Sequence, residues 1–321
     1  MAEPTPLWAT PVLPVVLAAL ALGTAGFDAV LSASADQGRA TSVREICLRA
    51  AGPLREAVRL TAQQRRRTSA ADQLLTRAGV LLLPMAAVLA CAVVPLGFNS
   101  VTDPDVGIVW FNAMEALAWA AVWLAGWGPN SALSLIGGYR FLAQGLAYEL
   151  PHMFALTTAA LGAESLRVGE VVEAQQGLWF AVWMPAAFGV YLLSAMAMAF
   201  WGPFDHPVGR DAAGGAVAEL SGADRLVFLA GRWLLLVVSA AFSVPLFLGG
   251  GHGPLLPGWA WTVIKTAVVL AVLVVARRMV PTVRMDRYMG FAWMVLVPLT
   301  LLQALAVAVV VLNNRSAGMI P

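Results

Sequence analysis

The sequence predicts an all-α polytopic membrane protein with eight transmembrane helices. Of its 321 residues, 60% are hydrophobic and only 12% are charged, and the apolar residues fall into long stretches. A typical soluble domain carries about 25% charged residues. Most of this chain must therefore face lipid or other apolar subunits, and residues 1–321 are expected to form a single membrane domain.

Each span follows from its length, because a helix needs about 20 mainly apolar residues to cross the hydrocarbon core. The first stretch has no Lys or Arg before it and no small-residue cleavage site followed by a polar domain, so we do not expect a cleaved signal peptide. The eight spans are predicted near residues 7–31, 78–98, 107–127, 139–161, 178–201, 226–248, 259–276 and 289–312.

The basic residues predict the orientation of these spans. Of the 20 Lys and Arg residues, sixteen fall in segments that alternate spans would place on one side. Only Arg167 and Arg315 fall on the other side, while Arg232 and Lys265 lie within spans. Loops rich in Lys and Arg stay in the cytoplasm. We therefore expect a bacterial plasma-membrane protein with both termini in the periplasm.

The segment 42–67, between the first two spans, is predicted to be an amphipathic helix on the cytoplasmic membrane surface. Ile46, Leu54, Val58 and Leu60 recur at roughly helical spacing among arginines, which is typical of an interfacial helix. Such a helix either anchors the loop to anionic lipid, lines an entrance for a lipid-soluble substrate, or docks a partner.

The fourth span carries the densest set of intramembrane polar residues. Arg140, Gln144 and Tyr148 follow i, i+4 spacing and therefore share one helix face. Glu149 lies about 100° around the helix from Tyr148, and His152 follows one turn later. Polar groups at this depth face the bundle interior or a hydrated cavity. They indicate either a proton relay or a helix-packing network.

Two further features extend this polar set. Glu115 in the third span and Lys265 in the seventh are deep ionisable groups, with Arg232 one turn into the sixth. They suggest a hydrophilic track, although each alone could be a structural ion pair. The cytoplasmic loop 202–225 is the second polar concentration, and loops on a rigid scaffold often carry function; the alternative is a solvated connection.

Several site classes find no support in the sequence. Cys47 and Cys91 fall in different segments, and the three histidines are scattered, so no metal, cluster or haem site is predicted. The small net charge of +2 gives no reason to expect nucleic-acid binding. We find neither repeated halves nor paired broken spans, which argues against a secondary transporter.

A series of short motifs runs along about residues 50–305. The motifs, in chain order, are Pro53, Glu56, Arg59 and Leu60; the run 126–131 with Gly137, Arg140, Gln144, Tyr148 and Glu149; Pro203-Phe204-Asp205; Glu219-Leu220-Ser221-Gly222; Phe247-Leu248-Gly249-Gly250; and Pro281, Arg284, Asp286, Met289 and Trp293. In order and spacing they resemble the H subunit of the proton-pumping NADH-quinone oxidoreductase, respiratory complex I.

The resemblance implies a membrane-arm subunit that forms part of a quinone chamber and the start of a proton path. The substrate would be a quinone, and iron–sulfur clusters would lie only in partner subunits. The expected partners are peripheral-arm iron–sulfur and quinone-site subunits, antiporter-like membrane subunits and the lipid bilayer. The expected proton-path or coupling residues are Glu149, Arg140, Gln144, Tyr148, Asp205, Asp211, Glu219, Glu115 and Lys265. The expected quinone-chamber or arm-contact residues are Arg284, Asp286, Phe204 and Arg59.

The chain also departs from the family pattern. The family's Glu and Arg just before its PFD motif are Met198 and Trp201 here, and a Glu of the sixth span is replaced near Gly231. These losses keep open the equivalent subunit of a membrane-bound hydrogenase-type complex. A secondary transporter and a purely structural anchor are the alternatives from other classes.

Overall fold

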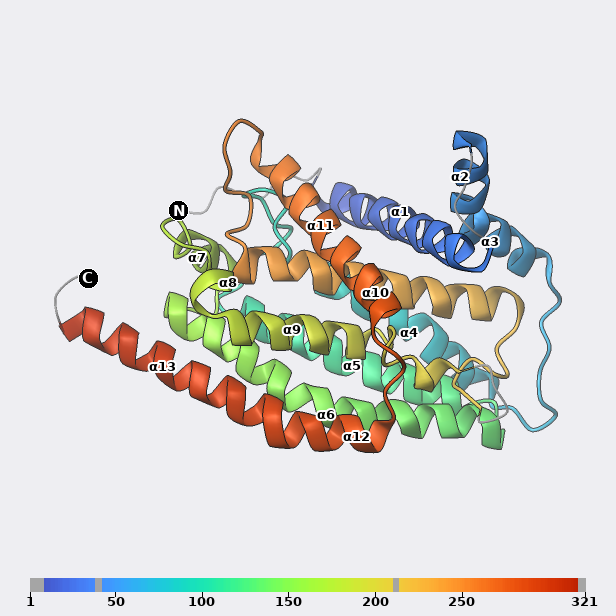
Figure 1. Ribbon diagram of the computed structural model, residues 1–321. Coiled ribbons are helices and arrows are strands. Elements are labelled where there is room, and N and C mark those ends of the chain that lie inside the picture. Colours follow the sequence, from blue (N-terminus) through green and yellow to red (C-terminus); the bar gives the residue numbers. More distant parts are fainter. Residues whose placement is uncertain (1–8, 38–41, 210–213, 317–321) are drawn as a thin grey trace.

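The computed structural model describes residues 9–37, 42–209 and 214–316, and within these residues the chain forms a bundle of long helices without a β-strand. The long helices run side by side (Figure 1). They are α1 (Ala9–Gln37), α4 (Gln73–Cys91), α5 (Gly107–Trp127), α6 (Ala132–Ala163), α9 (Pro185–Met198), α10 (Gly222–Phe247), α11 (Gly258–Met279) and α13 (Val297–Ser316). The shorter ones are α2 (Val43–Ala50), α3 (Gly52–Ala62), α7 (Val168–Glu173), α8 (Phe180–Trp183), α12 (Met285–Phe291), η1 (His206–Val208) and η2 (Ala292–Leu296).

Six of the described helical segments are long and apolar enough to cross a membrane. They are formed by α1, α4, α5, α10, α11 and the continuous run from α12 to α13. The third predicted span, residues 107–127, coincides with α5. The fourth and fifth predicted spans are not among the six: α6 is 32 residues long but carries the polar stripe, and α9 has only 14 residues.

The segment 42–67 differs from its prediction as one helix. It forms two short helices, α2 and α3, and helical structure ends at Ala62. The break follows from Pro53, which lacks an N–H and fits the first turn of a helix better than its interior. Leu54 and Val58 are exposed on α3, whereas Leu60 is buried. An amphipathic arrangement is therefore retained on α3.

The loop expected over 202–225 ends earlier, because α10 begins at Gly222. The loop does not extend freely from the bundle: Ala216, Val217 and Leu220 are buried. A Cβ on Gly137 of α6 would meet the backbone of Gly215 and Ala216. The absence of a side chain at Gly137 thus lets the loop pack directly against α6.

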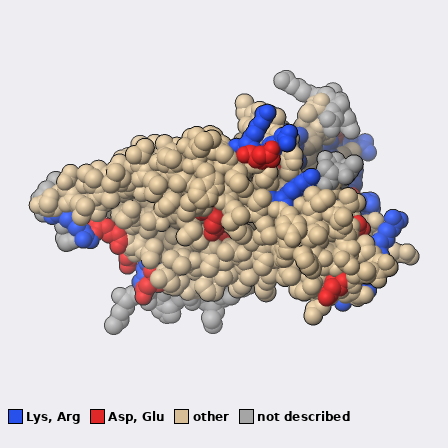
Figure 2. Space-filling model, turned by 90° about the horizontal axis from the view of Figure 1, so that it is seen from below, with Lys and Arg blue, Asp and Glu red and all other residues tan. Residues whose placement is uncertain are grey.

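The two ends of the bundle differ in what they carry. Helices α2 and α3 lie at one end, and α7 and α8 lie at the other (Figure 1). Figure 2 shows many of the charged side chains toward the ends of that face; large uncharged areas lie between them, with an acidic side chain near the centre. This distribution suits a bundle whose middle faces lipid. Between the ends, the core is packed closely enough that the rings of Phe111 and Phe242 stack at 3.7 Å.

Candidate functional site

The polar stripe of α6 faces the bundle interior, as predicted. Gln144, Tyr148 and His152 are each at most 1% exposed. Helix α6 packs between α5, α9 and α13, so polar groups on its inner face meet other helices and are kept from lipid. The stripe brings together one group of ionisable residues near the middle of α6 and another set of contacts near the start of α6.

The first group centres on a carboxylate–histidine pair. Glu115 Oε2 of α5 lies 2.7 Å from His152 Nε2 of α6, and both side chains are almost completely buried. The His152 ring lies 5.0 Å from the ring of Tyr191 on α9. The Tyr191 hydroxyl in turn donates to the carbonyl oxygen of Ser239 on α10 at 2.8 Å. Four helices thus meet around one ionisable pair.

Glu149 lies beside this pair. Its carboxylate accepts a hydrogen bond from Asn112 of α5 and interacts electrostatically with His152 and Glu115. Asn112 and Glu115 are three residues apart on α5, and Glu149 and His152 are three apart on α6, so each helix presents one turn to the other. We name Asn112, Glu115, Glu149 and His152 the buried acid–histidine cluster.

The N-terminal half of the α6 stripe holds the loop that precedes α10. Gln144 Nε2 donates to the carbonyl oxygens of Ala197, at 2.6 Å, and Phe204, at 3.2 Å. Arg140 donates to the carbonyl oxygen of Gly214 at 2.9 Å. One α6 face therefore contacts both the end of α9 and the loop.

The other predicted residues of the α6 stripe and the loop are placed as follows. Tyr148 accepts a hydrogen bond from Trp119 at 2.8 Å. Glu219 accepts one from Ser131 at 2.7 Å. Asp205 follows Phe204 in the loop and directly precedes η1, outside the buried cluster. Asp211 lies outside the described residues.

Lys265 is not brought together with the acids. Its Nζ donates to the carbonyl oxygens of Leu248, Gly250 and His252, at 2.7 to 2.9 Å. It also lies over the ring of Trp179 at 4.4 Å. These contacts hold the turn after α10, at the end of the bundle that carries α7 and α8.

The residues expected at the quinone chamber lie away from the end of the bundle that carries α7 and α8 (Figure 1). Arg59 pairs with Glu56 on α3 at 2.7 Å, and Arg284 pairs with Asp286 at 3.2 Å in a strongly exposed contact. Phe204 is buried, with its ring 4.4 Å from that of Tyr288. A cavity of about 400 Å³ lies nearby between α1, α3 and α10. Its wall includes Leu22, Glu56, Leu60, Leu229 and Trp233.

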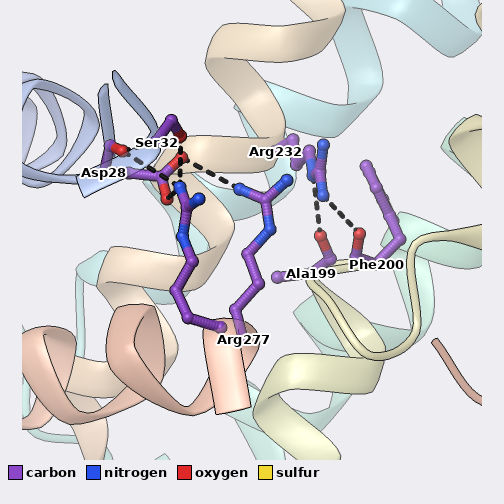
Figure 3. A network of polar contacts seen from close by, with 7 residues as sticks. Asp28, Ser32, Ala199, Phe200, Arg232 and Arg277 are labelled. Atoms are coloured by element: carbon purple, nitrogen blue, oxygen red, sulfur yellow. Dashed lines mark hydrogen bonds and ion pairs between the residues drawn. The ribbon is translucent and has the colours of Figure 1, made fainter. Parts of the chain in front are cut away.

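A further polar network joins α1 to α11 (Figure 3). Asp28 accepts from Arg277 at 2.9 Å and from Arg278 at 2.5 Å. The Arg277 guanidinium lies 4.5 Å from the ring of Trp201, and that of Arg232 lies 5.1 Å from it. The sequence prediction did not single out Asp28, although it stands as a lone acid in a long apolar stretch.

The fold and the site define a multi-pass membrane protein of the bacterial type, with ionisable groups buried midway along its helices. The NADH dehydrogenase family model matches residues 12–308. The chain therefore belongs to this family, and the resemblance noted from its motifs is confirmed. Within the described residues, no group of three His, Cys, Asp or Glu side chains could hold a metal ion.

The relatives agree on the same component of the enzyme, its H subunit. The chain is 33% identical to the first of the NADH-quinone oxidoreductase H subunits of Geobacter metallireducens over 264 residues, which is 79% of this chain and 80% of the relative. It is 38% identical to the first H subunit of Rhodopseudomonas palustris strain HaA2 over 227 residues, 70% and 71% of the two chains. The second H subunit of another R. palustris strain is 34% identical over 265 residues, 82% and 83% of the two chains.

Proposed function

We propose that the chain is the membrane subunit of an NADH-quinone oxidoreductase that contributes part of the quinone chamber and the start of a proton path. The observation that carries this proposal is the buried acid–histidine cluster, whose Glu149 and His152 lie on the same helix, α6, that binds the loop through Gln144. Ionisable groups at this depth are costly and mark proton or ion pathways. The subunit would act together with partners that hold the iron–sulfur clusters.

The cavity between α1, α3 and α10 supports a quinone chamber. Its volume of about 400 Å³ falls in the range of about 300–1,000 Å³ that small-molecule sites occupy. Its wall is mainly apolar, but Glu56 from α3 also contributes. An apolar wall beside the interfacial helix suits a molecule with a polar head and a hydrocarbon tail that enters from the bilayer.

Gln144 provides the proposed link between quinone chemistry and proton movement. Its side chain holds the carbonyl oxygen of Phe204, and it lies one turn from Tyr148 and Glu149 on α6. A shift of the loop therefore changes contacts on the helix that carries the acids. Coupling needs such an element with two arrangements, and Asp205, Asp211 and Glu219 are the loop acids that would bias it.

We propose that α6 and the pair α8–α9 complete an eight-span topology. At 1.5 Å per residue, the 32 residues of α6 extend about 48 Å, more than the hydrocarbon core of about 30 Å. Helices α8 and α9 continue one another over 180–198. The start of α1 and the end of α13 both lie toward the end that carries α7 and α8 (Figure 1), which supports termini on one side.

The partners are tested by purifying the chain from native membranes in mild detergent and identifying its companions by mass spectrometry. We expect iron–sulfur, quinone-site and antiporter-like subunits. Recovery with a nickel-hydrogenase large subunit would favour the hydrogenase-type alternative, and recovery alone would contradict both. The same preparation, reconstituted in liposomes, allows NADH-driven quinone reduction and proton uptake to be measured together.

The proton path is tested with Glu149→Gln in the reconstituted complex. The amide keeps the shape of the side chain but cannot carry the proton. We expect the variant to assemble and to lose proton uptake. Glu173→Gln, at an exposed position on α7, is the matched control and should pump normally. Full pumping by Glu149→Gln would favour a structural anchor.

The quinone chamber is tested by filling it. Ala57 of α3 lines the cavity, so Ala57→Trp should obstruct it and slow the reduction of long-chain quinone more than that of a short-chain quinone. Leu54→Trp adds the same side chain to an exposed position of α3 and serves as the control. Equal rates for Ala57→Trp and the control would contradict this placement of the chamber.

A further inference from the structure

We propose that Glu115 and His152 form a proton relay next to Glu149, so that the histidine supplies a titratable group in a chain that lacks several of its family's acids. This inference rests on the proposed function and names a second station of the same path. Its basis is the direct 2.7 Å contact between two almost fully buried side chains on α5 and α6.

The proposed step conserves both atoms and charge. Glu149 and His152 are not in direct contact, so the step needs one water between them. The O–H bond of protonated Glu149 breaks as its proton passes to the water, the water gives up one of its own protons to form an N–H bond on the His152 ring, and Glu149 is left as a carboxylate. The new imidazolium contacts the Glu115 carboxylate at 2.7 Å and also interacts electrostatically with the carboxylate of Glu149. The net charge of the cluster does not change during the transfer. Creating an isolated buried charge is costly, and this arrangement avoids it.

The titratable groups that face the pair come from two of the surrounding helices. Glu149 and Tyr148 face it from α6, and Tyr191 faces it from α9. Helix α10 contributes the carbonyl oxygen of Ser239, which accepts from the Tyr191 hydroxyl. Since the interacting groups are two acids and neutral phenols, a positive charge on His152 is stabilised where it forms.

The pair also retains unused hydrogen-bonding capacity. Glu115 Oε1, His152 Nδ1 and Glu149 Oε2 are buried and have no hydrogen-bond partner in the part of the chain that the structure describes. Buried polar atoms in folded proteins are usually paired. The Lys265 ammonium shows the contrast, because it donates to three carbonyl oxygens. Unpaired oxygen and nitrogen atoms on both members of the pair can accept a proton from one side and release it to the other.

The relay is tested in the intact complex in liposomes with His152→Gln and Glu115→Gln. Each variant keeps a polar side chain of related shape and removes one titratable group. We expect assembly and uncoupled electron transfer from NADH to a short-chain quinone to persist, while proton uptake is lost. His252→Gln is the matched control, because His252 contacts Gly249 and Phe98 at the other end of the bundle and should pump as the wild type does.

Infrared difference spectra during turnover provide a readout that a purely structural pair would not change. The relay predicts a histidine-ring band that shifts with ¹⁵N-histidine labelling and disappears in Glu115→Gln, because the Glu115 carboxylate contacts the ring that becomes charged. If His152→Gln fails to assemble, the band of the wild-type complex and its loss in Glu115→Gln still test the relay. A spectrum that Glu115→Gln leaves unchanged would contradict the relay.

The outcomes separate this inference from the proposed function. If Glu149→Gln stops pumping but His152→Gln and Glu115→Gln pump as wild type does, the proposed proton path stands and the relay is wrong. If none of the three affects pumping, the proton path itself is wrong. Loss of pumping in all three, with normal His252→Gln, supports both.

Discussion

Removing the Asp28 carboxylate should loosen α1 from α11. Asp28→Ala deletes the acceptor of two charge-assisted hydrogen bonds, from Arg277 and Arg278. Breaking a fully buried ion pair costs about 3–5 kcal/mol, whereas an exposed pair contributes about 0–1 kcal/mol. The Asp28 side chain is 12% exposed and the two arginines are 29% and 31% exposed. A cost of about 2 kcal/mol is therefore expected, because the arginines can partly rehydrate.

Hydrogen exchange in the intact complex measures the loss of local stability at α1. A loss of about 2 kcal/mol makes local opening about 30-fold more frequent, since about 1.4 kcal/mol is tenfold. The amides of α1 around Asp28 should exchange faster by that factor in Asp28→Ala. Asp286→Ala breaks a pair whose side chains are more than 70% exposed and should leave exchange within about twofold. An unchanged α1 in Asp28→Ala would refute the reasoning.

Three other substitutions test the packing and the placement of the stripe. Gly79→Leu should reduce the amount of assembled complex strongly, because the added carbon meets the backbone of Ala125; Gly189→Ala, which enters open space, should not. Lys265→Met should lower the free energy of unfolding by about 2 kcal/mol, and with it the thermal midpoint, because three carbonyl oxygens lose their donor; the proton-to-electron ratio should persist, and its loss would instead support the predicted proton-path role. Gln144→Leu should slow quinone reduction in turnover assays, because the loop loses its contact with α6; a wild-type rate would contradict the coupling role.

The helices could largely be predicted from the sequence because hydrophobic length is a local property. Residues 107–127 were predicted within the bounds that α5 shows. The boundaries of helices were predicted less well than their existence, because a single residue can end or start a helix. Pro53 divides the predicted surface helix in two, and α10 begins at Gly222, before the predicted start of its apolar run.

The site could be predicted only in part, because contacts between helices depend on their relative rotation and register. Spacing along α6 predicted that Gln144, Tyr148 and His152 share the interior. It could not predict that His152 meets Glu115 of α5, or that Asn112 donates to Glu149. Lys265 was grouped with the proton-path residues because of its position within a predicted span. That position does not reveal that the ammonium group donates to carbonyl oxygens of the turn after α10.

The departures from the family pattern become interpretable through these contacts. Where the resembled family has an Arg before its PFD motif, this chain has Trp201, and the guanidiniums of Arg232 and Arg277 lie 5.1 and 4.5 Å from that indole ring. Positive charge is thus kept at this position by residues of α10 and α11. Arg232 also donates to the carbonyl oxygens of Ala199 and Phe200, which ties α10 to the end of α9. Away from the helix ends, the acids of the long helices fall into two places: Asp28 pairs with Arg277 and Arg278 beside this aromatic contact, whereas Glu115 and Glu149 lie in the buried acid–histidine cluster, where a histidine accompanies them.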